Sequence, residues 1–274
     1  MLSLTRLESH LVPLEAECLR PDTLASLDNT TISHLTVWHG KTKAEVGDFF
    51  KVQGSASDGE ILLRGDCSRV KLAGSGMTAG TLRVDGPIGM HTGANMRGGL
   101  IRIDGNAGDW LGAEMHGGMI VVNGNAGHHT GAAYRGAQRG MRGGEIIITG
   151  STGDELGSTL RRGLIVVGGD TGAFPGINLL AGTIVILGKS GVRPGAAMRR
   201  GSLLVPHHKP ELLPTFQCAG PLDSVFPALY FQYLEKLAKR LDLNQTLALK
   251  PWPQLTRYAG DNVTLGKGEI LCPA

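Results

Sequence analysis

The chain has 274 residues, of which 42 are glycine and 5% are aromatic, and its formal net charge is +3 at pH 7. So mild a charge gives no argument for nucleic acid or a membrane surface as a partner. The sequence holds no apolar run of 18 residues and no signal-peptide pattern, so we expect a cytoplasmic protein. Its four cysteines are scattered and form no C-x-x-C pair, so no metal site is expected on this chain.

Residues 1–58 lack the glycine pattern of the residues that follow, and we interpret them as an N-terminal cap. Leu2 and Leu4 predict a short strand within it. Stacked-repeat proteins need such caps, because an end unit otherwise exposes its core and an unpaired strand edge.

Residues 59–206 contain a repeat. Glycines that follow a strand fall at positions 86, 105, 124, 150, 169 and 188, so their spacings are 19, 19, 26, 19 and 19 residues. Each opens the spelling G-x-x-G-x-x-x-G, and we expect these glycines to form tight turns at positive φ. A fixed period of this length is typical of stacked-repeat proteins. In the first three units the structural glycines are Gly86, Gly89, Gly93, Gly105, Gly108, Gly112, Gly124, Gly127 and Gly131.

Each unit carries one strand whose second and fourth residues are apolar, which predicts that one face of the strand points inward. The rest of each unit is too rich in glycine for a helix. We therefore predict an all-β fold, a right-handed β-helix solenoid with coils of about 19 residues. The expected strands are 81–85, 100–104, 119–123, 145–149, 164–168, 183–187 and 202–206.

The third position of these strands is expected to point outward. It is Arg83 and Arg102 in the early units and aliphatic in the later ones. A row of outward aliphatic side chains marks a covered face, so we expect either the helix predicted at 226–241 or another chain to pack there. The apolar interface candidates are Val121, Ile147, Val166, Val185 and Leu204.

A bulky apolar residue recurs three positions after the last glycine of each motif, and we place Tyr134 in this column in the third unit. Seven extra residues separate Tyr134 from the next strand, and such insertions emerge as loops from one face, often the binding face. The residue after the column is usually arginine, which predicts a basic edge. It either holds an anionic partner or is a row of solvated charges. The candidate binding residues are Arg97, Arg135, Arg139, Arg142, Arg161, Arg162 and Arg199.

Residues 207–274 form a C-terminal helix and tail. Tyr230, Leu234, Leu237 and Leu241 follow helical spacing, and a last strand is expected at 263–265.

A second column brings together Asp109, His128 and Asp154, beside Trp110, His129 and Glu155. The alternatives are a metal or proton-handling cluster and a surface ladder of carboxylates and imidazoles, and we favour the ladder. No nucleophile elbow, zinc-protease or kinase signature occurs, so no catalytic residue is expected on this chain.

The repeat resembles two known families: the C-terminal domain of the glutamate synthase large subunit and the C subunit of formylmethanofuran dehydrogenase. The flanks favour the second. Residues 39–40 and 46–52 resemble that family's entry into the repeat, and 77–80 and the insertion 134–141 resemble its spellings. The similarity covers roughly residues 30–205, and it is greatest to members found in a bacterial formyltransferase/hydrolase complex.

This resemblance implies a non-catalytic scaffold subunit. In such a complex the formyl group passes from tetrahydromethanopterin to a methanofuran analogue and is hydrolysed to formate. The implied partners are an amidohydrolase-like A subunit, a B subunit and a formyltransferase D subunit. No cofactor is expected on this chain, whereas a methanofuran-type carrier and zinc are expected on the partner subunits. Because such carriers bear polyglutamate tails, the arginines of the basic edge are candidates for holding that tail.

Two other functions stay open. One is the C subunit of an archaeal tungsten or molybdenum formylmethanofuran dehydrogenase. The other is a free-standing β-helix enzyme acting on a polymer, which requires a groove lined by carboxylates, whereas the columns of this chain are mostly basic or apolar.

Overall fold

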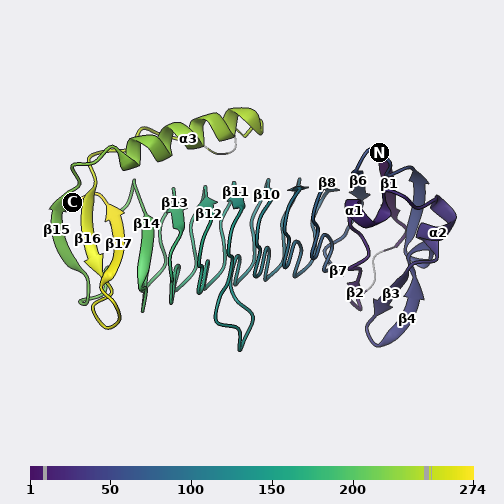
Figure 1. Ribbon diagram of the computed structural model, residues 1–274, viewed down its shortest axis with the longest axis horizontal. Helices are drawn as coiled ribbons and strands as arrows, with labels where there is room; N and C mark the ends of the chain where they lie inside the picture. Colours follow the sequence, from purple (N-terminus) through teal and green to yellow (C-terminus); the bar gives the residue numbers. More distant parts are fainter. Residues whose placement is uncertain (9–10, 244–246, 248) are drawn as a thin grey trace.

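The computed structural model describes residues 1–8, 11–243, 247 and 249–274. Figure 1 shows an elongated molecule in which the repeat strands are stacked along the long axis. The N-terminal region lies at one end of the stack, the C-terminal strands lie at the other, and helix α3 lies along one side. Most of the regular structure is therefore β.

The strands of the stack belong to a 13-stranded sheet in the order β15-β16-β17-β14-β13-β12-β11-β10-β9-β8-β6-β1-β5. Their bounds are β1 (Leu2–Arg6), β5 (Phe50–Gly54), β6 (Glu60–Arg64), β8 (Thr81–Asp85), β9 (Leu100–Ile103), β10 (Met119–Val122), β11 (Glu145–Ile148), β12 (Leu164–Val167), β13 (Thr183–Ile186), β14 (Arg200–Leu204), β15 (Gln217–Pro221), β16 (Thr256–Gly260) and β17 (Lys267–Cys272). The seven strands expected from the repeat are confirmed, each to within two residues at either end.

Neighbouring repeat units pair in parallel and in register, so the same position of each unit lies in one column. Ile120 of β10, for example, pairs with Ile101 of β9 on one side and with Ile146 of β11 on the other. A second parallel column of single bridges runs from Cys67 to Thr171. The second and fourth residues of the strands are buried in the main core, as the period of two predicts.

The N-terminal region adds a small sheet of order β4-β3-β2-β7 and short helices. Their bounds are β2 (Leu14–Glu15), β3 (Thr36–His39), β4 (Thr42–Glu45), β7 (Val70–Lys71), α1 (Pro21–Leu24), α2 (Asn29–Ser33) and the 3-10 helix η1 (Val46–Asp48). Strand β1 lies between β5 and β6, antiparallel to the first and parallel to the second. The start of the chain thus adds β1 and β5 to the first edge of the stack.

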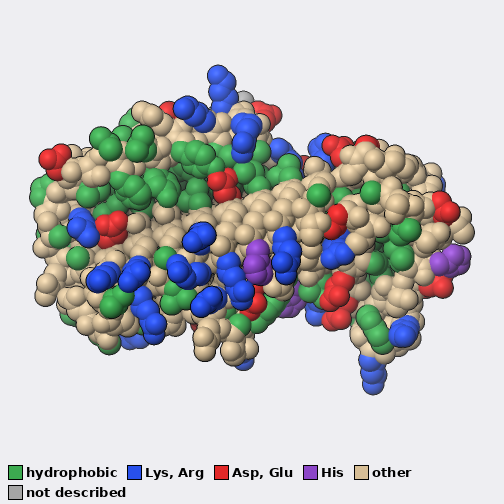
Figure 2. Space-filling view, in the orientation of Figure 1, with side chains coloured by type: hydrophobic (Ala, Val, Ile, Leu, Met, Phe, Trp, Pro, Cys, Tyr) green, Lys and Arg blue, Asp and Glu red, His purple; other side chains and the backbone are tan. Residues whose placement is uncertain are grey.

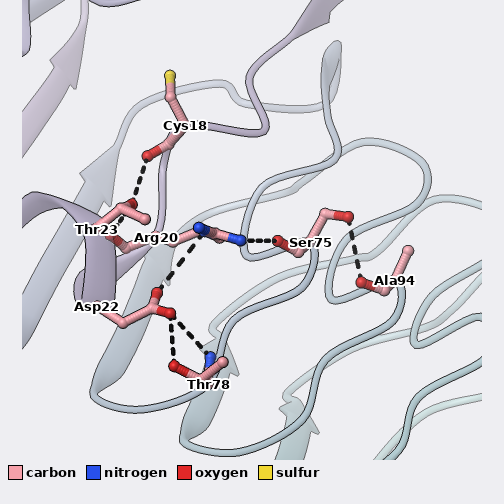
Figure 3. A network of polar contacts seen from close by, with 7 residues as sticks. All are labelled: Cys18, Arg20, Asp22, Thr23, Ser75, Thr78 and Ala94. Carbon is pink, nitrogen blue, oxygen red and sulfur yellow. Dashed lines mark hydrogen bonds and ion pairs between the residues drawn. The ribbon is translucent and has the colours of Figure 1, made fainter.

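A polar network ties this region to the first repeat units (Figure 3). Arg20 Nη1 donates to the carbonyl oxygen of Ser75 at 3.4 Å, and Ser75 Oγ donates to the carbonyl oxygen of Ala94 at 3.2 Å. The Asp22 carboxylate accepts from Thr78 N at 3.1 Å and from Thr78 Oγ1 at 2.7 Å. Bonds to a charged group are among the stronger ones, so this network fixes α1 against the stack.

At the other end, β17 pairs in parallel with β14 and extends the stack by one strand. The strand expected at 263–265 is wrong, because these residues form the turn between β16 and β17. Asp261 organises this turn, since its carboxylate accepts from Val263 N at 3.1 Å and from Ala197 N at 2.9 Å.

Helix α3 (Phe226–Arg240) follows β15 and confirms the helix expected from the spacing. It runs over the outer face of the repeat strands, where Leu234, Leu237 and Ala238 are buried. Its C-terminal end is held by Arg102 of β9, whose Nη1 donates to the carbonyl oxygen of Leu241 at 2.9 Å. Fifteen helical residues span about 22 Å, close to the width of five strand steps, so one helix covers most of the face.

The motif glycines have two different physical roles. The third glycine of each motif adopts positive φ as predicted; Gly112, for example, has φ +60°. The second does not. A Cβ on Gly108 would lie 2.8 Å from the backbone nitrogen of Met90, so it is the close approach of the preceding unit that requires glycine there.

Two glycine substitutions separate backbone strain from crowding. We expect Gly112→Ala to destabilise the chain by about 2–4 kcal/mol, because its Cβ would lie 2.6 Å from Ile146 Cδ1 in the core and the residue keeps its positive φ. Gly136→Ala is the matched control, since it also has positive φ but nothing lies within 4 Å of its Cβ. It should cost only about 1 kcal/mol. Equal losses in urea unfolding would contradict the assignment of Gly112 to the packed core.

Candidate functional site

The basic edge follows a column of backbone hydrogen bonds, which fixes its members. Each residue after the bulky apolar column donates its N–H to the carbonyl of the column residue one unit earlier. His116 N donates to Met96 at 2.7 Å, Arg142 N to Met115 at 2.6 Å and Arg161 N to Met141 at 2.8 Å. The column along the stack is Arg97, His116, Arg142, Arg161, Leu180 and Arg199.

Two residues therefore lie elsewhere than predicted in the third unit. Met141, not Tyr134, takes the core position and is fully buried, and Arg142, not Arg135, takes the edge position. The thioether of Met141 is buried at no polar cost, whereas a tyrosine hydroxyl there would need a partner. The sequence contains a signal for this register: Met141-Arg142-Gly143-Gly144 repeats the pattern Met115-His116-Gly117-Gly118 directly before the strand.

The insertion thus comprises residues 134–140, and an aromatic cluster anchors its base. The Tyr134 ring stacks on Trp110 with centroids 5.1 Å apart, and Trp110 stacks on His129 at 4.3 Å. Tyr134 Oη and His91 Nδ1 are hydrogen bonded at 3.0 Å, and Tyr134 N donates to Glu114 Oε1 at 3.1 Å. Because rings from the two preceding units contact Tyr134, the insertion leaves the stack at a fixed point.

The insertion borders a trench on the basic edge. A cavity of about 690 Å³ lies beside Gln138 and Arg139 of the insertion and also touches Leu265 in the β16–β17 turn. Arg161 and Arg199 of the column line it, together with Arg200. Figure 2 shows Lys and Arg side chains in a row along the stack on this face. Four guanidinium groups thus border one cavity that no carboxylate lines among the described residues.

The charges of this edge are mostly uncompensated. Within the described part of the chain only Arg142 among the seven candidate arginines has an ion pair, with Glu114 at 4.0 Å. Arg142 Nη1 also lies 3.4 Å from His116 Nε2. Burial, together with Arg142 and Arg97, lowers the pKa of His116, so this imidazole stays neutral at pH 7. All seven arginines are exposed, and such a row attracts anions.

The column of carboxylates and imidazoles is a structural ladder. Asp109 Oδ1 accepts from His128 N at 2.8 Å, His128 Nδ1 from Asp154 N at 2.9 Å, and Asp154 Oδ1 from Ala173 N at 2.7 Å. Each side chain satisfies a backbone N–H of the next unit. Among the described residues no group of three His, Cys, Asp or Glu side chains is arranged to hold a metal ion.

Helix α3 covers the outward aliphatic row. All five residues are fully buried in a second core cluster with Leu234 and Leu237 of the helix. Of the two coverings left open by the sequence, the structure shows the helix, so a partner could reach these five side chains only by displacing α3. The five are Val121, Ile147, Val166, Val185 and Leu204.

None of the helices among the described residues has the length and hydrophobicity of a membrane-spanning segment.

No family model matches the chain. It is 42% identical over 83 residues to the C subunit of the molybdenum-containing formylmethanofuran dehydrogenase 1 of Methanothermobacter marburgensis, a segment that covers 30% of this chain and 21% of that protein. It is 38% identical over 94 residues to the C subunit of the tungsten-containing formylmethanofuran dehydrogenase 2 of Methanothermobacter thermautotrophicus, covering 33% and 35%. The chain thus spans about a fifth to a third of the curated relatives' length.

A solved structure matches over the whole length. A chain in the crystal structure of the formyltransferase/hydrolase complex (FhcABCD) from Methylorubrum extorquens, determined with methylofuran, superposes with a TM-score of 0.87. It is 33% identical, and the match covers 99% of both chains. The chain belongs to the family of formylmethanofuran dehydrogenase C subunits. Its full-length counterpart is the C subunit of the bacterial formyltransferase/hydrolase complex.

Acidification tests the anchor of the insertion. Burial, reinforced by Lys71, lowers the pKa of His91. The His91 imidazole therefore takes up a proton less readily in the folded protein than in the unfolded chain. Stability from His91 is therefore fully present above pH of about 6.5 and is lost as the pH falls through the lower folded pKa. We expect His91→Gln to lose less unfolding free energy between pH 7.5 and 5 than wild type.

Tyr134→Phe is the control for this experiment, because it removes the hydrogen bond to His91 but keeps the titrating imidazole. It should lower stability at pH 7.5 while keeping most of the pH dependence. An unchanged pH dependence in His91→Gln would show that His91 does not contribute to it.

Proposed function

We propose that the chain is the non-catalytic scaffold subunit of a formyltransferase/hydrolase complex that converts formyl-tetrahydromethanopterin to formate by way of formylmethanofuran. The observation that carries this proposal is the match over 99% of both chains to a member of the FhcABCD complex. Its partners are the amidohydrolase-like A subunit, the B subunit and the formyltransferase D subunit. The methanofuran-type carrier and zinc belong to those partners.

The architecture suits a scaffold. We infer that the repeat units wind as a right-handed β-helix between a cap (1–58) and a C-terminal region (207–274). The two in-register parallel columns support this winding. A stack of main-chain ladders is stiff, with neighbouring strands about 4.8 Å apart, so surfaces on different units keep fixed separations. A rigid rod of this kind holds two partner enzymes at a constant distance.

The basic edge contributes to this function by holding an anionic chain. The trench runs between the insertion and the β16–β17 turn and presents Arg139, Arg161 and Arg199. Guanidinium groups bind carboxylates through paired N–H donors, and they stay charged at every physiological pH. The polyglutamate tail of a methanofuran-type carrier, or an acidic partner surface, is the ligand that this edge fits. The remaining candidates Arg97, Arg135, Arg142 and Arg162 extend the same surface.

A dehydrogenase subunit is the second candidate, favoured by the tungsten- and molybdenum-containing relatives. Those matches cover 35% or less of the relatives, against 99% of the matched chain from the formyltransferase/hydrolase complex. A free-standing enzyme acting on a polymer is disfavoured, because the trench is lined by arginines instead of a pair of carboxylates.

Purification tests the scaffold proposal. The tagged chain, expressed at its native level, should recover hydrolase-like and transferase-like subunits, and only this assembly should release formate from formyl-tetrahydromethanopterin. Recovery of a molybdopterin-type subunit with cysteine-rich partners would favour the dehydrogenase instead. A chain isolated alone would contradict both.

Arginine substitutions test the trench. Replacing Arg139, Arg161 and Arg199 together by alanine should weaken binding of the carrier at least about 100-fold, because each charge-assisted hydrogen bond contributes about 1.5–3 kcal/mol. Binding by wild type should also weaken as salt is raised. Arg64→Ala is the matched control, since Arg64 is exposed on β6 outside the trench. Unchanged carrier affinity, assembly and turnover in the triple variant would exclude a role for the edge.

A further inference from the structure

Helix α3 presents a second apolar face in addition to the buried one. Val225, directly before the helix, and Leu229 and Tyr233 within it follow one another at intervals of four residues and therefore share one side. Their exposed fractions are 73%, 58% and 39%. The core contacts on another side of the helix come from Leu234 and Ala238, while Leu237, four residues after Tyr233, lies at the border between the two sides and is also buried. We call Val225, Leu229 and Tyr233 the exposed stripe.

A groove accompanies this stripe. It has a volume of about 500 Å³ and lies between α3 and the first residues of β11, β12 and β13. Leu229, Tyr230 and Tyr233 form one wall, and the glycines that precede the three strands contribute to the floor. Figure 2 shows hydrophobic side chains gathered below α3. Because glycine has no side chain, the backbone of an occupant can approach this floor closely, and an open apolar surface of this kind marks an interface.

Most polar groups inside the groove are already engaged, although Glu145 Oε2 is buried without a hydrogen-bond partner among the described residues. The Tyr233 hydroxyl donates to Glu145 Oε1, and Tyr230 Oη and Thr183 Oγ1 are hydrogen bonded at 2.9 Å. Burial and the Glu145 bond raise the pKa of Tyr233 to about 12, so the tyrosine stays a neutral donor. The middle of the groove therefore offers its occupant chiefly apolar contacts.

Two cationic side chains continue the exposed stripe toward the C-terminal end of the helix. Lys236 and Arg240 are exposed, and their positions continue the side that carries Leu229 and Tyr233. Neither forms an ion pair within the described residues. Figure 2 shows Lys and Arg side chains at this end of α3. The surface is thus apolar along one half and basic along the other.

We propose that this groove binds an amphipathic α-helix of a partner subunit, with apolar side chains against Leu229 and Tyr233 and acidic side chains at Lys236 and Arg240. The inference rests on the proposed function, because it requires the hetero-oligomeric complex. Lys236 and Arg240 lie seven and eleven residues after Leu229, which corresponds to about 10–17 Å along a helix. The acidic residues of the partner therefore lie two to three turns from its anchor at Leu229 and about one to two turns from its anchor at Tyr233.

A second copy of this chain fits the surface less well. Antiparallel pairing of two α3 helices about Leu229 would place Lys236 opposite Leu222 and Arg240 opposite Cys218, with Asp223 as the nearest acid. Those residues precede the helix, so they cannot continue a helical contact. Parallel pairing would bring like charges together. The distribution of charge therefore favours a partner of different sequence.

Charge insertion in the whole complex tests the proposal. Leu229→Glu places a carboxylate in the apolar half, and Lys236→Glu with Arg240→Glu reverses the basic half. Each variant should lower the recovery of partner subunits with the tagged chain at least tenfold at 0.3 M salt. Ala228→Glu is the matched control, because Ala228 is exposed on α3 but lines a different cavity, and it should assemble like wild type.

Photo-crosslinking identifies the occupant even if a variant folds poorly. A photoreactive residue at position 229 of the otherwise native complex should join a partner peptide that carries apolar residues and Asp or Glu at the stated spacing, whereas position 228 should not. A crosslink to a second copy of this chain, or none, would overturn the proposal. If wild type recovers no partner subunit, the proposed function fails. If wild type and all variants assemble equally, only the groove is wrong.

Discussion

The fold depends on main-chain hydrogen bonds between each repeat unit and the next. Equivalent residues pair in register through β8–β14, and further backbone bonds follow the edge column and the turns. This pairing fixes the separation of units, and it explains why so many positions accept no side chain. It also explains the polar ladders, in which Asp109, His128 and Asp154 each accept a backbone N–H that the turns would otherwise leave unpaired.

Stacking turns a period in the sequence into columns on the surface. An arginine that recurs at one position in the motif becomes a row of guanidinium groups a few ångströms apart, and such a row repels itself. Only Arg142 of the seven candidate arginines has a carboxylate partner within the described residues. An anionic ligand would offset this repulsion. The insertion, anchored on Trp110 and His91, forms one side of the cavity beside the row.

Over β10–β14, the outer face of the sheet is apolar instead of charged, so it must be covered from water. The change from Arg102 in β9 to Val121 in β10 marks the place where the face becomes apolar, and α3 covers it from there onward. Arg102 itself accommodates the end of the helix by donating to Leu241. Helix α3 carries apolar side chains on two sides. One side is buried against the sheet, and the exposed stripe with its groove stays available to a partner.

The period, the strands and their inward faces follow from the amino-acid sequence, because alternation and glycine spacing are local patterns that the stack repeats. The sequence also identified the family and the helix of the C-terminal region. It misplaced Tyr134 and Arg135, because counting forward from the glycines assumes that the insertion begins after the core residue. The structure shows that Met141, with the spelling that precedes every strand, restores the register. Three features appear only in the folded chain: the helix that covers the aliphatic row, the pairing of the last strands and the set of arginines that share a cavity. These depend on the arrangement of residues far apart in the chain, such as the hydrogen bond from Arg102 to Leu241 and the shared cavity of Arg139 and Arg199, which no local pattern encodes.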